Sequence, residues 1–123
     1  KEAGWFENIS EQMQIIISAS FNLENFSEGE TIFKEGHTSK EMYIIVRGNV
    51  TGNSNGKQLN FYKPGDIIGY DSFLSNNKIS ETTETLSPVV ALRIDHSAMR
   101  KLISKHKELK IKFQAKVAKY QTS

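Results

Sequence analysis

Residues 29–69 read GETIFKEGHTSKEMYIIVRGNVTGNSNGKQLNFYKPGDIIG, and this stretch decides the fold because glycines divide it into short β-like runs. Its glycines stand at positions 29, 36, 48, 52, 56, 65 and 69. The runs between them are rich in β-branched and aromatic residues, at 31–33, 42–46, 59–62 and 67–68. Short strands separated by glycine-containing turns about every 8–12 residues are typical of a sandwich or a roll, and not of βαβ units.

Two turns can be predicted from residue type. The sequence Asn-Ser-Asn-Gly at 53–56 predicts a hairpin tip, because Asn and Gly adopt positive φ at low cost. The sequence Lys-Pro-Gly-Asp at 63–66 predicts a second tight turn, in which Pro presets one φ and Gly supplies the other.

Helices are predicted at both ends of the β-rich region. Asn8 or Ser10 is placed to cap a helix within the first 20 residues. Near the other end, Asp95 or Ser97 is placed to cap a long helix. The apolar residues of that second helix recur at steps of three and four and form one stripe opposite the lysines. They are Met99, Leu102, Ile103, His106, Leu109, Phe113, Val117 and Tyr120.

These elements predict a mainly β fold with flanking helices in a single domain over residues 1–123. We expect an N-terminal helix in 1–20, an eight-stranded jelly-roll-like β-roll at 21–95, and one C-terminal helix over 96–123 that serves as a lid or hinge. The chain begins with Lys1 and without a leader pattern, which predicts that it is a piece of a larger protein.

Composition narrows the possible functions. The chain has no cysteine, so disulfides, thiolate nucleophiles and Cys-based zinc sites are excluded. Its net charge is +2, but the charge is unevenly distributed, because residues 96–123 hold 8 Lys/Arg and one acid whereas residues 1–95 hold 8 Lys/Arg and 13 acids. A basic segment can meet nucleic acid, an anionic membrane or an acidic partner, and it can equally be the solvated face of a helix.

Neither catalysis nor a metal site is predicted. The three histidines, His37, His96 and His106, are far apart and lack the spacing of metal ligands. Asp71 and Glu81 could pair as acid and base, but no nucleophile stands near them in the sequence. We therefore expect neither catalytic residues nor a cofactor.

Four segments, in this order and spacing, carry a resemblance to a known family. They lie at 26–36 (FSEGETIFKEG), 40–48 (KEMYIIVRG), 64–69 (PGDIIG) and 91–95 (ALRID). Over nearly its whole length the sequence resembles the cyclic-nucleotide-binding domain family. The sequence at 40–45 is similar to that of the domains of cation channels and ion exchangers, which implies the cytosolic part of a membrane protein that takes part in ion transport. The lack of cysteine fits the same cytoplasmic location.

The resemblance implies a binding cassette with defined roles. In the family an Arg pairs with the cyclic phosphate, a Glu accepts from the ribose hydroxyl, and backbone N–H groups after a Gly supply further donors. With Gly69 aligned, the Glu position falls on Tyr70 and the Arg position falls on Ile79, while Lys78 lies one residue early. The resulting ligand-binding candidates are Gly69, Tyr70, Asp71, Ser72, Lys78, Ile79 and Ser80, in a cassette that departs from the family pattern.

The leading functional hypothesis is a regulatory domain with a degenerate cassette, which binds cAMP or cGMP weakly or not at all and acts through helix movement and contacts with the rest of a larger protein. One alternative is a working cAMP or cGMP sensor that uses Lys78 and backbone donors. Another is a docking module that uses the basic helix on a membrane or an acidic partner. Nucleic-acid binding is not expected, because no helix-turn-helix follows the helix.

Overall fold

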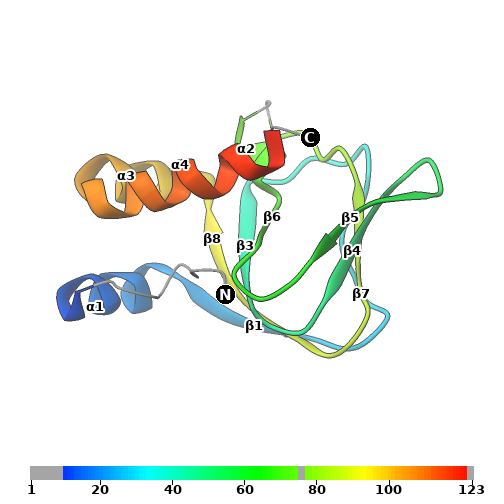
Figure 1. Ribbon diagram of the computed structural model, residues 1–123, viewed down its shortest axis with the longest axis horizontal. Helices are drawn as coiled ribbons and strands as arrows, with labels where there is room; N and C mark the ends of the chain where they lie inside the picture. The colour runs from blue at the N-terminus through cyan, green and yellow to red at the C-terminus, as the bar shows by residue number, and fades with distance from the viewer. Residues whose placement is uncertain (1–9, 75–76, 122–123) are drawn as a thin grey trace.

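Two four-stranded antiparallel sheets face each other and form the walls of a roll, and helices pack on one side of it (Figure 1). The computed structural model describes residues 10–74 and 77–121, with side chains described as far as Ala118. Sheet A has the strand order β1-β8-β3-β6, and sheet B has the order β2-β7-β4-β5. The predicted eight-stranded roll with flanking helices is therefore confirmed.

The elements follow one another without a β-α-β repeat. They are α1 (Glu11–Ser20), β1 (Asn22–Phe26), β2 (Thr31–Phe33), β3 (Glu41–Arg47), β4 (Val50–Ser54), β5 (Lys57–Tyr62), β6 (Ile67–Ile68), α2 (Tyr70–Leu74), β7 (Thr82–Thr85), β8 (Val89–Asp95), α3 (His96–Lys105) and α4 (Lys107–Gln121).

Strand β3 is apolar along most of its length because both faces of sheet A are buried. Met42 and Ile44 pack into a core cluster that the strand shares with the helices. Tyr43 and Ile45 point the other way, into the interior between the two sheets. Alternation between polar and apolar residues is a sign of a strand with one solvated face, so a strand covered on both sides shows a continuous apolar run instead.

The predicted turns form as their residue types require. Asn55 and Gly56, at the tip between β4 and β5, have φ values of 53° and 78°. Two successive positive φ values are the signature of the tight hairpin turn that matches strand twist. Gly65, in the second predicted turn, has a φ of 94°.

Helix α1 begins where one of the two predicted caps lies. The hydroxyl of Ser10 accepts a hydrogen bond from the Met13 N–H at 3.1 Å, which satisfies one of the free donors at the helix start. The other predicted cap, Asn8, and the rest of the predicted helical segment before residue 10 lie outside the described residues.

The prediction of one continuous C-terminal helix is wrong. His106 has φ −127° and ψ 97°, an extended conformation, and its N–H closes the end of α3 on the Leu102 carbonyl at 3.0 Å. The chain therefore turns between α3 and α4, and α4 runs back across the roll (Figure 1). The physical reason is burial, because a straight helix would carry the second half of its apolar stripe away from the core.

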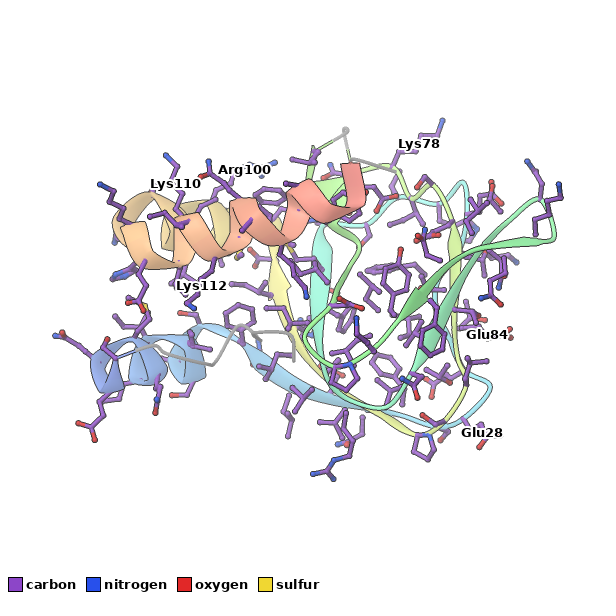
Figure 2. The ribbon with its side chains drawn as sticks, viewed as in Figure 1. Glu28, Lys78, Glu84, Arg100, Lys110 and Lys112 are labelled. Atoms are coloured by element: carbon purple, nitrogen blue, oxygen red, sulfur yellow. The ribbon has the colours of Figure 1, made fainter. Side chains whose placement is uncertain are left out.

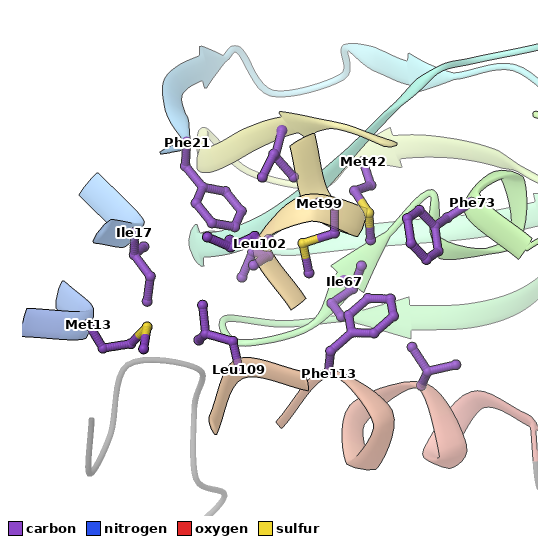
Figure 3. Close-up of a cluster of buried hydrophobic side chains, with 13 residues drawn as sticks. Met13, Ile17, Phe21, Met42, Ile67, Phe73, Met99, Leu102, Leu109 and Phe113 are labelled. Carbon is purple, nitrogen blue, oxygen red and sulfur yellow. The ribbon is translucent and has the colours of Figure 1, made fainter. Parts of the chain in front are cut away.

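The break places both halves of the stripe in one cluster (Figure 3). Met99 and Leu102 come from α3, and Leu109 and Phe113 come from α4; all four side chains are buried. Val117, further along α4, is also buried, whereas the side chain of Tyr120 lies outside the described part.

A buried ion pair fastens α4 to the roll. Lys116 Nζ lies 3.1 Å from Asp66 Oδ1, and the two side chains are 9% and 6% exposed. Asp66 also accepts a hydrogen bond from the Lys63 N–H at 2.9 Å, so its carboxylate holds the predicted turn at 63–66 together. One carboxylate therefore connects the helix to the turn that leads into β6.

We expect Lys116→Met to lower the free energy of unfolding by about 1–3 kcal/mol, because the buried Asp66 carboxylate loses a buried cation and keeps the half-exposed Lys63 ammonium, 4.0 Å away. Urea unfolding measures the change. The matched control is Lys110→Met on the exposed side of the same helix, which should cost less than about 0.5 kcal/mol. Equal midpoints for the two variants would show that the pair does not hold α4.

Candidate functional site

The cassette begins at a glycine that the local packing requires. Gly69 joins β6 to α2 and has a φ of 88°. A Cβ at this position would lie 2.7 Å from Cε2 of the Phe33 ring, which is closer than real contacts allow. Any other residue would meet both the ring and an unfavourable φ, so the sharp turn into the short helix depends on glycine.

A chain of hydrogen bonds links the cassette helix to the start of α3. The Ser72 hydroxyl donates to the Gly69 carbonyl at 2.8 Å and lies 3.1 Å from His96 Nε2. The other ring nitrogen, Nδ1, lies 3.1 Å from Asn77 Oδ1. Ser72 and His96 are 1% and 3% exposed. A serine buried this deeply cannot be reached by a substrate. We therefore assign a positioning role to these hydrogen-bonded side chains.

Phe73 connects α2 to both C-terminal helices. Its ring centroid lies 5.4 Å from that of His96, and 5.4 Å from that of Phe113 in α4, with edge-to-face geometry in both pairs. Figure 3 shows Phe73 beside Phe113. The Arg100 guanidinium lies 4.6 Å from the ring centroid and donates to the Phe73 carbonyl at 3.0 Å. Phe73 therefore places the cassette helix in direct contact with both α3 and α4.

The second half of the cassette runs beside the segment before β3. Ile79 exchanges backbone hydrogen bonds with it, donating to the His37 carbonyl and accepting from the Gly36 N–H, each at 2.9 Å. The Ile79 side chain is 3% exposed and belongs to the core between the sheets. Lys78 points out to solvent on the outer side of the roll (Figure 2).

Asp71 occupies the hydrogen-bond donors of Ser80. Its Oδ2 accepts from the Ser80 N–H at 2.8 Å and from the Ser80 hydroxyl at 2.5 Å. Ser80 directly follows the position where the family resemblance places an Arg. A carboxylate of the protein therefore takes the donors that would otherwise be open to an anion at this end of the cassette.

A second carboxylate lies on the inner face of sheet B. Glu81 accepts from the Tyr62 hydroxyl and from Asn60 Nδ2, the latter at 2.9 Å. Its Oε1 would lie 2.3 Å from a Cβ built on Gly52 of strand β4, so the carboxylate rests directly on that glycine. Glycine at position 52 thus makes room for the Glu81 carboxylate on the inner face of the sheet.

Tyr70, where the resemblance places a Glu, lies near both of these carboxylates. Burial and the charges of Asp71 and Glu81 raise the pKa of its phenol above the ordinary value. The phenol therefore stays protonated at neutral pH and presents a neutral hydroxyl among negative charges. Between residues 69 and 82 the sequence has one cation, Lys78, and its side chain is exposed. Acidic side chains therefore outnumber basic ones in the cassette.

The sequence placed seven candidates in the cassette, and the structure brings some of them together. Gly69 and Ser72 meet through a hydrogen bond, as do Asp71 and Ser80. Tyr70 lies close enough to Asp71 to feel its charge, whereas the Lys78 and Ile79 side chains point to solvent and to the core.

Sequence reasoning missed the residues that connect the cassette to the helices. His96 was considered only as a metal ligand, and Phe73 was not considered as a link at all. Their sequence positions carry one usable signal, which is that His96 directly follows the predicted cap Asp95 and so belongs to the first turn of the helix.

Within residues 10–74 and 77–121 there is no group of three or more His, Asp or Glu side chains that could hold a metal ion. The helices in this part of the chain are also too short or too polar to span a membrane.

The His96 network predicts a pH dependence of stability. Burial and the nearby Arg100 charge hold the pKa of His96 below its ordinary value, so the folded protein keeps the ring neutral. As the pH falls below about 6.5 the unfolded chain takes up a proton that the folded chain does not, and the free energy of unfolding falls. Urea unfolding between about pH 7.5 and pH 5.5 measures this slope, which His96→Gln should reduce.

The matched control is His37→Gln, because the His37 side chain is exposed. This variant should keep the wild-type slope. The assignment to His96 fails if the two variants show the same dependence on pH.

Comparison with known proteins shows which family has this architecture. Residues 23–106 match the family described as "Cyclic nucleotide-binding domain". The chain is 25% identical over 114 residues to a CRP-like cAMP-activated global transcriptional regulator of Mycobacterium tuberculosis, covering 87% of this chain and 50% of the regulator. It is 24% identical over 99 residues to a cGMP-dependent protein kinase of Toxoplasma gondii, covering 80% of this chain and 10% of the kinase.

The fold is also similar to that of the Catabolite Activator Protein of Thermus thermophilus, with a TM-score of 0.82, 18% identity, and coverage of 97% of this chain and 58% of that one. The chain spans half or less of the length of both curated relatives, so their complete activities do not transfer to it. The match to the family extends from β1 to the end of α3 and includes the whole cassette. This chain belongs to the cyclic nucleotide-binding domain family.

Proposed function

We propose that this chain is a regulatory domain whose degenerate cassette binds cAMP or cGMP weakly or not at all, and that it acts through movement of α3 and α4 and through contacts with the rest of a larger protein. It carries out no chemistry of its own in this proposal. By the resemblance of residues 40–45, the larger protein would be an ion-transport protein with this domain on its cytosolic side.

The hydrogen bonds from Ser80 to Asp71 carry this proposal. A cyclic nucleotide brings an anionic phosphate, which needs donors and positive charge. The donors of Ser80 are already satisfied by a carboxylate 2.8 Å and 2.5 Å away. A phosphate at this position would have to displace Asp71 and would then be repelled by its negative charge. Binding would therefore cost both the existing hydrogen bonds and the repulsion between the two anions.

The positions aligned with the family's two main ligand contacts support the same conclusion. Ile79 has no charge and is buried in the core, and Tyr70 is a neutral phenol. A charge-assisted hydrogen bond contributes roughly 1.5–3 kcal/mol, so the loss of two costs about 4 kcal/mol. Since about 1.4 kcal/mol is a factor of ten, a micromolar site becomes roughly millimolar.

The contacts of Phe73 support action through the helices. This side chain touches residues of α3 and α4, and its helix α2 belongs to the cassette. A change in the position of α4 would therefore displace the cassette helix, and a change at the cassette would displace α4. Neither change would need a ligand in the pocket. Such coupling requires two arrangements of the helices, which partners in the larger protein would select.

The alternative, a working sensor, would depend on Lys78 and on backbone donors. Lys78 forms an isolated bridge with Thr38 and its side chain points to solvent. To reach the interior between the sheets, where the Ile79 side chain points, Lys78 would have to turn around the strand, because neighbouring residues of an extended chain point to opposite sides. The geometry therefore favours the degenerate cassette.

Calorimetric titration with cAMP and with cGMP tests the proposal. We expect dissociation constants of about 1 mM or weaker for both nucleotides, from the contact losses above. Low micromolar binding of either one would overturn the degenerate cassette and establish the sensor. Adenosine and guanosine, which lack the phosphate, serve as a parallel titration, because Asp71 should not repel them.

The role of Asp71 has its own test. Asp71→Asn keeps the shape of the side chain but removes its negative charge, so the affinity for cAMP should rise by about tenfold. The matched control is Glu84→Gln, an exposed carboxylate on β7 that gives the same change in net charge. If both variants bind cAMP equally, the charge of Asp71 is not what excludes the phosphate.

A further inference from the structure

The turn between α3 and α4 gathers exposed lysines at one end of the helix pair. Helix α3 ends at Lys105, His106 is extended, and α4 begins at Lys107. Lys101 lies one turn before this break and Lys110 one turn after it, and all four lysine side chains are exposed. We call Lys101, Lys105, Lys107 and Lys110, together with Ile111, the basic tip.

We propose that the basic tip is a docking surface for an anionic lipid membrane. This inference is independent of whether the cassette binds a nucleotide. It concerns a surface that lies on the helices and not in the pocket.

The charges of the basic tip are available for an outside partner. Within residues 10–74 and 77–121 no ion pair joins any of its four lysines to another side chain. Other cations of the helices are already engaged, because Lys116 pairs with Asp66 and Arg100 binds the Phe73 carbonyl.

Ile111 adds apolar surface beside these charges. Its side chain is 55% exposed, whereas Leu109 and Phe113 on the same helix are buried. Ile111 follows Lys110 directly and lies one turn after Lys107. An exposed apolar side chain between lysines is typical of surfaces that lie at a membrane interface, where affinity combines apolar burial with attraction to anionic lipid.

The use of lysine favours a lipid surface over nucleic acid or a phosphopeptide. Arginine gives the two-pronged contacts by which individual phosphates are recognised, whereas lysine acts as a flexible point charge. The four cations of the basic tip are all lysine, and Arg100 in α3 is held by its contacts with Phe73. Four such lysines are attracted by the electric field of a charged surface more than they recognise one defined phosphate group.

The charge of the molecule is divided along its length. Residues 96–121 hold 8 Lys/Arg and one acid, whereas residues 10–95 hold 7 Lys/Arg and 11 acids. Figure 2 shows Lys110 and Arg100 on the helical side, with Glu28 and Glu84 at the opposite end of the roll. An anionic surface would attract the helical end and repel the other, so the domain would approach in one orientation.

The experiment is cosedimentation of the protein with vesicles of phosphatidylserine and phosphatidylcholine in equal parts, compared with vesicles of phosphatidylcholine alone. We expect binding only to the anionic vesicles. Binding should weaken steeply between about 0.1 M and about 1 M salt, over which the screening length falls from ~10 Å to ~3 Å. Equal binding to both vesicle types, or to neither, would overturn the proposal.

Two pairs of variants locate the surface. Lys107→Gln combined with Lys110→Gln should lower partitioning by about 25-fold, since each lysine near an anionic membrane contributes roughly a factor of five. The matched control is Lys34→Gln combined with Lys57→Gln, two exposed lysines of the roll, which should bind as wild type does. Equal losses in the two pairs would show that net charge alone, and not the basic tip, causes binding.

A substitution at Ile111 separates lipid from an acidic protein. Ile111→Ser should weaken vesicle binding several-fold even at high salt, because it removes apolar surface, whereas Leu59→Ser, at a 59% exposed residue of β5, should leave it unchanged. Binding to soluble polyglutamate that equals vesicle binding, together with no effect of Ile111→Ser, would assign the basic tip to an acidic protein instead and overturn the lipid proposal.

Discussion

Burial of sheet A on both faces is the constraint on which the rest of the structure depends. One face closes the interior of the roll through Tyr43 and Ile45, and the other receives the helices through Met42 and Ile44. A sheet with this much apolar surface cannot be left with one side in water, so α1, α3 and α4 have to pack on it. The helices are thereby part of the core and not appendages, and a change in their position alters the packing behind β3 and β6.

Because β6 leads directly into the cassette, the same constraint joins the cassette to the helices. Ile67 belongs to the cluster shared with the helices, and two residues later Gly69 turns the chain into α2. Phe73 then returns from α2 to the same cluster, where it meets Phe113. The Asp66–Lys116 pair is attached at the other end of β6. Residues on both sides of the short strand thus contact α4, so the cassette helix and α4 pack in one cluster.

The sequence predicted the roll well because its evidence is local. Glycines at positive φ and a Pro-Gly turn specify where strands end, independently of what the strands pack against. Strands β1 and β4 gave no such signal, since NLENF and VTGNS are polar or interrupted by glycine and are extended only because β8 and β7 pair with them. The break at His106 could not be predicted for the same reason, because an apolar stripe continues across it and only the position of the core decides that α4 turns back.

In the candidate site, alignment by spacing named candidate positions, which stay predictions, and it could not show their hydrogen-bond partners. The family resemblance aligns Tyr70 with a Glu and Ile79 with an Arg, and this alignment predicts lost contacts with a ligand. That the freed donors of Ser80 are occupied by Asp71 depends on the fold of the loop, and that Glu81 rests on Gly52 depends on the pairing of distant strands. Contacts between residues far apart in the sequence produce no periodic pattern from which they could be predicted.

A cassette whose donors are satisfied from within differs from one that waits for a ligand. In an open site, buried donors without partners are costly, and a ligand that satisfies them stabilises one conformation. Here the Ser80 donors are exposed and are hydrogen-bonded to Asp71, so under the proposed function an anionic ligand would gain only the difference between its own contacts and those of the carboxylate. Under the proposed function, control would come from the helical side, where Phe73 contacts both α3 and α4 and where the lysines of the basic tip have no partner among the described residues. The contacts of Phe73 would then carry a shift of α3 or α4 to the cassette, in place of a ligand in the cassette moving the helices.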